Sequence, residues 1–117
     1  MHRFPNLLKF VRQKDEPEVY LVTSSGLKRH LPDSQILRLY GQTEEIVTLE
    51  DKKIVDLLPE NYLIRGKGQT KVYFLDQKIK RWITSPETLK KMGFDWSEVV
   101  EIEPQELDYY PEGSPIF

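Results

Sequence analysis

The sequence predicts an α+β protein of two tandem small units, each with a β-hairpin, a short capped helix, a further strand and a helical turn. Three observations predict this class. Lys-Arg followed by an aromatic and an aliphatic residue occurs at 28–31 and again at 80–83. Alternating β-branched and aromatic residues flank positions 76–78, as in a hairpin. Ser85-Pro86-Glu87 then supplies the residues that begin a helix.

The chain contains two copies of one pattern, offset by 52 or 53 positions. The strand Val19–Val22 aligns with Val72–Leu75, and Leu7-Leu8-Lys9 is expected to match the leading strand Leu63-Ile64-Arg65. Self-similarity at a period near this length indicates units that fold alike. We therefore expect a first, diverged unit at 1–62 and a second unit at 63–117.

Each unit is expected to contain a hairpin. In the second unit the strands cover 71–75 and 79–83. In the first unit Thr23-Ser24-Ser25-Gly26 forms the turn, and Gly26 is the residue expected at positive φ. The glycine-rich segment 65–69 lacks the spacing of a phosphate-binding loop and is interpreted as a turn between strands.

A short helix should follow each hairpin. Ser85 caps a helix over Pro86 to Met92 that ends at Gly93, and its counterpart runs from Ser34 to Gly41 after Asp33. Helices this short are marginal alone, so packing against the hairpin must stabilise them.

The last part of the second unit also carries signals for secondary structure. Asp95 and Glu98 can form a capping box, with Phe94 packing on Val99. Residues 100–102 alternate like a strand, and 104–109 can form a helical turn before Pro111. The small sheets should therefore be mixed.

Composition excludes several classes of protein. The chain has 117 residues, 38% hydrophobic residues, a net charge of −2 and no cysteine, so disulfides and thiolate chemistry are absent. No apolar run is long enough to span a membrane. The N-terminal residues lack the apolar stretch of a secretory signal, which favours a cytoplasmic chain or one cut from a longer protein.

Charge is unevenly distributed in the second unit. Residues 65–81 include six basic residues and one acid, whereas 95–112 include seven acids and no basic residue. One interpretation is two solvated faces that pair with each other. The alternatives are steering of a ligand, stacking of copies into an oligomer, or nucleic-acid binding by the basic segment, which the near-neutral net charge does not favour.

The repeated Lys-Arg pairs are the sharpest candidates for a binding site. A basic pair beside an aromatic residue on a strand can grip an anionic group and stack a sugar or base. The expected ligand-binding residues are Tyr20, Lys28, Arg29, Tyr73, Lys80, Arg81 and Trp82, on one exposed face. The competing interpretation is that strand alternation sends part of this set into the core.

The sequence predicts no enzyme. His2 and His30 lack the spacing of metal ligands, and Ser24 and Ser25 lie in no nucleophile elbow. The carboxylates are numerous, but none stands in an apolar setting that would tune it for acid catalysis. We therefore expect no catalytic residues, no metal and no cofactor.

The pattern V-Y-F-L-x-x-x-I-K-R-W-I-x-S-P-E-T-x-x-x-x-G-F-D-W-x-x-V, from Val72 to Val99, resembles a module found in tandem in bacterial secreted and cell-surface proteins. The family's Leu…Pro-x-Gly ending matches Leu107, Pro111 and Gly113. The first unit departs from it, with His30 at the aromatic position and Gln42-Thr43-Glu44 in place of Phe94-Asp95-Trp96.

This resemblance implies a non-catalytic binding or spacer module of a bacterial surface or cell-wall-associated protein, with cell-wall glycan or another protein as its partner. It implies an extracellular location, whereas the chain itself leaves the compartment open. The rival hypotheses are a structural or assembly subunit of a phage or filament, joined through basic hairpin and acidic tail, and nucleic-acid binding by residues 65–81.

Overall fold

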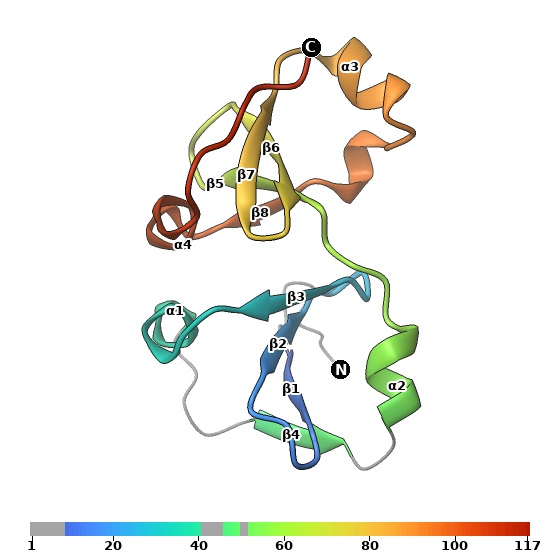
Figure 1. The fold of residues 1–117 in the computed structure, drawn as a ribbon, viewed down its shortest axis with the longest axis vertical. Helices are drawn as coiled ribbons and strands as arrows, with labels where there is room; N and C mark the ends of the chain where they lie inside the picture. Colours follow the sequence, from blue (N-terminus) through green and yellow to red (C-terminus); the bar gives the residue numbers. More distant parts are fainter. Residues whose placement is uncertain (1–8, 41–45, 50–51) are drawn as a thin grey trace, which may run out of the picture. The chain divides into compact units, whose positions relative to one another are not determined.

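A computed structural model describes residues 9–40, 46–49 and 52–117 (Figure 1). The chain divides into two compact units, and the boundary between them falls between Glu60 and Asn61. The sequence placed this boundary between Tyr62 and Leu63. We call residues 1–60 the first unit and residues 61–117 the second unit.

The described residues of the first unit form a four-stranded mixed sheet and two short helices. In chain order its elements are β1 (Lys9–Gln13), β2 (Val19–Val22), β3 (Lys28–Leu31), α1 (Ser34–Leu39), β4 (Ile46–Leu49) and α2 (Lys52–Leu57). The strand order is β3-β2-β1-β4. Strand β1 pairs antiparallel with β2 and parallel with β4.

The second unit repeats this topology. Its elements are β5 (Leu63–Gly66), β6 (Val72–Asp76), β7 (Ile79–Ile83), α3 (Pro86–Lys91), the 3₁₀ helix η1 (Trp96–Glu98), β8 (Val100–Ile102) and α4 (Pro104–Tyr109). The strand order is β7-β6-β5-β8, with β8 parallel to β5. The predicted class, α+β with two similar units, is confirmed.

The strand registers correct one detail of the expected alignment. Phe10 pairs with Leu21, just as Leu63 pairs with Phe74. Phe10-Val11-Arg12 is therefore the counterpart of Leu63-Ile64-Arg65, and the alignment with Leu7-Leu8-Lys9 is wrong. Both triplets are apolar-apolar-basic, so the letters alone could not choose between them. Leu7 and Leu8 lie outside the described residues.

The hairpin turns have the backbone that tight connections need. Gln77 and Lys78 join β6 to β7 with φ angles of 50° and 71°. Positive φ at both central residues gives the twist that favours a two-residue hairpin. Gly26 has φ of 88° in the longer turn of the first unit, as predicted.

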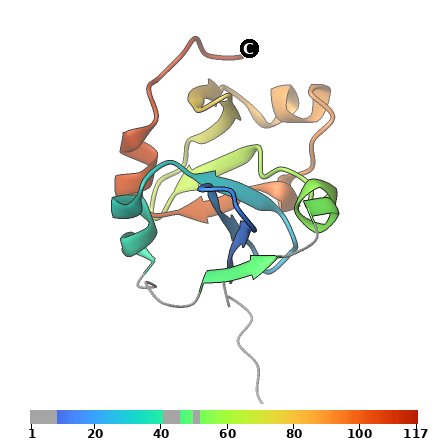
Figure 2. The same ribbon diagram turned by 60° about the horizontal axis from the view of Figure 1, so that its bottom comes forward.

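The sheet of the second unit is covered on both faces. Leu63 belongs to a cluster with Val72, Ile83 and Leu89 of α3. The neighbouring Ile64 belongs to a cluster with Tyr73, Ile102, Tyr110 and Leu107 of α4. Because successive strand residues point to opposite faces, α3 and α4 lie on opposite sides of this sheet, as the ribbon shows (Figure 2). In the first unit Phe10, Leu21, Leu31 and Ile36 form a cluster under α1.

The predicted helix caps are present. The Ser85 side chain accepts a hydrogen bond from Thr88 N at 3.1 Å, and Asp33 accepts from Gln35 N and Ile36 N. Asp95 and Glu98 form the predicted capping box. Gly93 has φ of 88°, whereas its expected counterpart Gly41 lies outside the described residues.

The C-terminal segment runs parallel to β7 along its outer edge. Ile116 N donates to Trp82 O at 2.7 Å, and Thr84 N donates to Ile116 O at 3.1 Å. Gly113 packs so closely on β7 that an added Cβ would lie 2.7 Å from Ile79 Cγ2. Across the described residues, no helix has the length and apolar character needed to cross a bilayer.

Candidate functional site

Two buried lysines hold equivalent positions in the two units. Lys28 Nζ donates to Val55 O at 2.8 Å, and Lys80 Nζ donates to Leu107 O, also at 2.8 Å. Both carbonyls lie near the C-terminal end of a helix, α2 or α4, and each also accepts one main-chain N–H, that of Leu58 or Tyr110. Each ammonium also lies 5.6 Å from the centre of a tyrosine ring, Tyr20 or Tyr73. Each lysine therefore joins its hairpin to the helix that closes its unit.

This packing corrects the expected exposed face. The side chains of Lys28, Arg29, Tyr73 and Lys80 are buried, with 2–9% of each residue exposed. Strand alternation and the long lysine stems place them against the helices, as the competing interpretation held. These four residues therefore do not form the exposed face that the sequence predicted.

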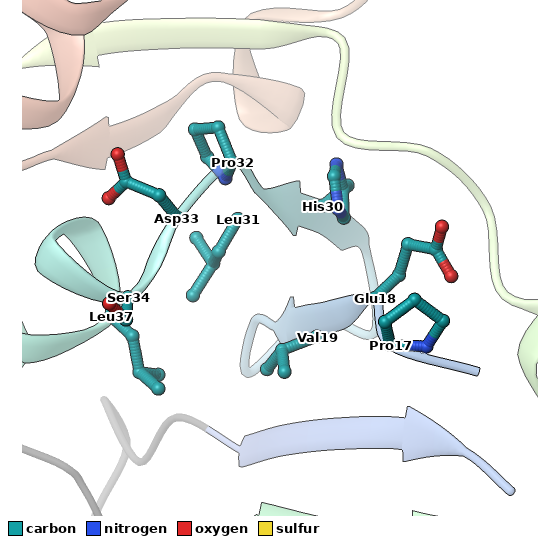
Figure 3. Close-up of a pocket in the computed structure, with 9 residues that line it drawn as sticks. All are labelled: Pro17, Glu18, Val19, His30, Leu31, Pro32, Asp33, Ser34 and Leu37. Atoms are coloured by element: carbon teal, nitrogen blue, oxygen red, sulfur yellow. The ribbon is translucent and has the colours of Figure 1, made fainter. Parts of the chain in front are cut away.

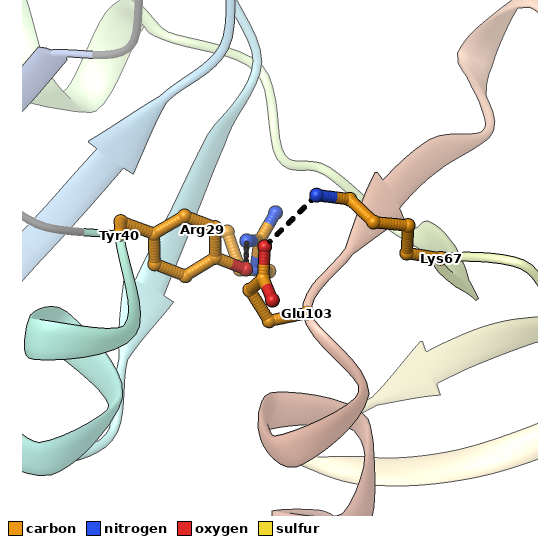
Figure 4. A network of polar contacts seen from close by, with 4 residues as sticks. All are labelled: Arg29, Tyr40, Lys67 and Glu103. Carbon is orange, nitrogen blue, oxygen red and sulfur yellow. Dashed lines mark hydrogen bonds and ion pairs between the residues drawn. The ribbon is translucent and has the colours of Figure 1, made fainter.

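The two arginines of the repeated pairs have different partners. Arg29 Nη2 donates to Tyr40 Oη at 3.2 Å (Figure 4). Arg81 is half-buried, with Nε donating to Ser114 O at 2.9 Å and Nη1 lying 3.7 Å from Asp76 Oδ2. Lysine keeps one role in both units, whereas arginine does not.

The oppositely charged segments of the second unit pair with each other. Arg65 Nη2 lies 3.3 Å from Glu101 Oε2, and Lys67 Nζ lies 3.2 Å from Glu103 Oε2 (Figure 4). These pairs follow from the parallel register of β5 and β8. Exposed pairs of this kind stabilise by at most about 1 kcal/mol. They do, however, occupy much of the basic segment.

A groove of about 250 Å³ lies at the rim of the second sheet, which we call the Trp82–Trp96 groove. Three stretches line it: the start of β6, the end of β7 with the first turn of α3, and η1. Trp82 also packs against the α4-side cluster, and Ile83 belongs to the α3-side cluster. The groove thus lies where the two faces of the sheet meet. Its lining residues are Thr70, Lys71, Val72, Trp82, Ile83, Thr84, Ser85, Pro86 and Trp96.

The groove combines aromatic surface with a cation. Lys71 Nζ lies 4.4 Å from the centre of the Trp82 ring. Trp82 is half-buried, and Trp96 is 51% exposed. Among the described residues Lys71 has no carboxylate within ion-pair distance. An aromatic plane beside an available ammonium suits a ligand with a flat face and an anionic group.

The first unit has a groove at the same place in its fold, with a volume of about 350 Å³ (Figure 3). We call it the His30 groove. Leu31, Val19 and Leu37 surround the cavity, and His30 projects from the other side of β3 (Figure 3). The registers make His30 the counterpart of Trp82, and Glu18 precedes β2 as Lys71 precedes β6. The two grooves are therefore equivalent in position and different in chemistry.

Burial raises the pKa of both tyrosines in the candidate set, Tyr20 and Tyr73. Desolvation, followed by the nearby Glu112 and Asp108, raises the pKa of Tyr73 above its ordinary value. Desolvation and several carboxylates, of which Glu18 is the strongest, likewise raise the pKa of Tyr20. Both phenols therefore stay neutral near pH 7.

The sequence identified Trp82 but missed its partner in the groove. Lys71 lies just before a strand, and only the register shows that it reaches the Trp82 ring. Nothing in the sequence placed Trp96 beside Trp82. Within the described ranges, no three His, Asp or Glu side chains gather as a metal cluster.

Comparison with family models, curated proteins and solved structures found no match to this chain, so its resemblance to tandem surface modules stays a prediction.

Proposed function

We propose that this chain is a non-catalytic binding module that holds a glycan in the Trp82–Trp96 groove, for attachment at a bacterial surface. The observation that carries the proposal is the gathering of Trp82, Trp96 and Lys71 on one groove. Two separate parts of the repeat contribute the tryptophans, and the fold brings them to the same rim.

Sugar rings match such a surface. Their C–H faces are apolar and pack on indole rings, while their edges present hydroxyls that need polar partners. At the rim, Thr70 is an exposed hydroxyl-bearing residue and Lys71 is an exposed donor. An open groove also suits a polymer, because the chain can continue beyond the contacted rings.

The internal ion pairs make the assembly alternative less favourable. In that hypothesis the basic hairpin of one copy meets the acidic tail of another. Glu101 and Glu103 already pair with Arg65 and Lys67 in the same unit, and Lys80 is buried. The same pairing reduces the charge available for the phosphates of a nucleic acid.

The test is binding to purified peptidoglycan and to chitohexaose, a neutral β-1,4-linked N-acetylglucosamine oligomer. We expect Trp96→Ala to weaken both by at least about tenfold, since tryptophans commonly dominate binding energy. The matched control is Leu57→Ala, an apolar residue that is 80% exposed and lies outside the groove. No binding of either material by the unmodified chain would refute the proposal.

A further inference from the structure

The two equivalent grooves carry opposite charges at one position. Lys71 precedes β6 in the second unit, and Glu18 precedes β2 in the first. The surrounding framework is retained, because Val19 pairs with Leu31 as Val72 pairs with Ile83. This position therefore varies without disturbing the strands, as expected of a residue that contacts a ligand rather than the core.

Lys71 also differs from four of the five other cations in residues 65–81. Arg65, Lys67 and Arg81 have carboxylate partners, and Lys80 is buried against Leu107 O. The Lys71 side chain is exposed, and its ammonium interacts with the Trp82 ring. This contact holds the charge beside the aromatic surface without neutralising it.

We infer that the Trp82–Trp96 groove takes an acidic glycan, whose sugar ring packs on tryptophan while its carboxylate or phosphate pairs with Lys71. The inference rests on the proposed function and names its ligand class. A cation over an indole face remains able to donate hydrogen bonds to an anion at the rim. A neutral glycan would leave this charge without a partner in the complex.

The expected preference is modest, because the pair would be exposed. Exposed ion pairs are worth roughly 0.2–1 kcal/mol, which corresponds to at most about a fivefold difference in affinity. Salt should reduce it, since the screening length falls from about 10 Å at 0.1 M to about 3 Å at 1 M. The aromatic contribution should not change in this way.

Three oligosaccharides with one backbone separate these contributions. Chitohexaose is neutral. Peptide-free glycan strands, in which N-acetylglucosamine alternates with N-acetylmuramic acid, add a carboxylate. Chitohexaose phosphorylated at its 6-hydroxyls adds a phosphate instead. We expect at least one acidic form to bind about three- to fivefold more tightly than chitohexaose at low salt. The tighter of the two identifies the anion.

Variants at Lys71 then test the cause. Lys71→Gln should bind all three oligosaccharides alike, and Lys71→Glu, which carries the charge of Glu18, should prefer chitohexaose. Lys67→Gln is the matched control, because Lys67 already pairs with Glu103 and does not line the groove. It should keep the preference for the acidic form. Circular dichroism checks that each variant is folded.

Two results would overturn the inference while leaving the proposed function intact. One is equal binding of neutral and acidic forms by the unmodified chain. The other is a preference that survives in Lys71→Gln, because the selecting charge would then lie elsewhere. If no oligosaccharide binds, the proposed function fails, and this inference fails with it.

Discussion

Lys28 and Lys80 are structural equivalents, each with its ammonium 2.8 Å from a helix carbonyl and 5.6 Å from a tyrosine ring centre. Each also donates its main-chain N–H to a proline carbonyl, that of Pro59 or Pro111. The recurring lysine in Lys-Arg is therefore explained by the architecture of one unit. A ligand is not needed to account for it.

Lys80→Met should destabilise the second unit. The apolar stem is kept and Leu107 O still accepts from Tyr110 N, but it loses the charge-assisted hydrogen bond from Lys80 Nζ, which should cost roughly 1.5–3 kcal/mol. Both tryptophans of the chain lie in this unit, so tryptophan fluorescence during urea unfolding reports on it. Lys90→Met, at an exposed position on α3, should stay within about 0.5 kcal/mol. Equal effects of the two substitutions would contradict the structural role assigned to Lys80.

Gly113→Ala should loosen the C-terminal segment from β7. The new methyl group would lie 2.7 Å from Ile79 Cγ2 and 3.3 Å from Arg81 Cγ, so one side must move. Overpacking of this kind costs about 1–3 kcal/mol. Hydrogen exchange at the Ile116 amide, which donates to Trp82 O, should become faster. Ser114→Ala is the control, and similar protection in both variants would argue against close packing at Gly113.

Tyr110→Phe should cost roughly 1–3 kcal/mol in the second unit. The Tyr110 hydroxyl donates to Glu106 Oε2 at 2.5 Å, and the Glu106 side chain is fully buried. Removing the donor leaves a buried carboxylate short of a hydrogen bond. Tyr109→Phe, next in sequence and 48% exposed, provides the comparison. The prediction fails if urea midpoints of the two variants coincide.

Tyr73 should make the second unit lose stability in alkali. Burial raises the pKa of Tyr73 above 10.0, so the folded chain holds this proton longer than the unfolded chain does. The Tyr73 hydroxyl therefore adds to the free energy of unfolding. This stabilisation is complete below about pH 10 and is lost as pH rises through the pKa of Tyr73 in the folded chain. Urea unfolding of Tyr73→Phe across this range should show a shallower decline. If the stability of Tyr73→Phe falls with pH as steeply as that of the unmodified chain, groups other than Tyr73 cause the loss.

Asp95 provides a second pH-dependent site. Hydrogen bonds from the Ser97 side chain and main-chain N–H lower the pKa of Asp95 below 3.8. The ionised Asp95 carboxylate therefore stabilises the folded chain. This stabilisation is present above the pKa of Asp95 in the unfolded chain and is lost as pH falls through its pKa in the folded chain. Ser97→Ala removes the hydroxyl, so the pKa of Asp95 should rise toward its ordinary value. Carbon-detected NMR titration of the Asp95 carboxyl measures it, and no change would contradict the assignment.

Much of the fold could be predicted because the local signals agreed with one another. Ser85, Pro86 and Gly93 mark the ends of α3, and Gly26 marks the turn between β2 and β3. The leading strand of the first unit was misaligned because Leu7-Leu8-Lys9 and Phe10-Val11-Arg12 carry the same pattern. Only hydrogen bonding across the sheet distinguishes them.

The site was harder to predict than the fold. Sequence shows that Lys80 and Trp82 lie on one strand, but not that α4 buries the lysine and leaves the indole at the rim. Lys71 is adjacent to Trp82 only across the hairpin, and Trp96 only through the packing of η1. Contacts between distant segments determine all three positions, and a single sequence does not reveal them.

The ion pairs of β5 and β8 affect how quickly a charged partner would arrive. Positive and negative groups that lie about 3 Å apart cancel at longer range, and the chain as a whole carries −2. An acidic polymer would feel almost no attraction until Lys71 is within reach. We therefore expect diffusional encounter at the rate of unsteered proteins, about 10⁵–10⁶ M⁻¹s⁻¹, with selectivity expressed mainly in residence time.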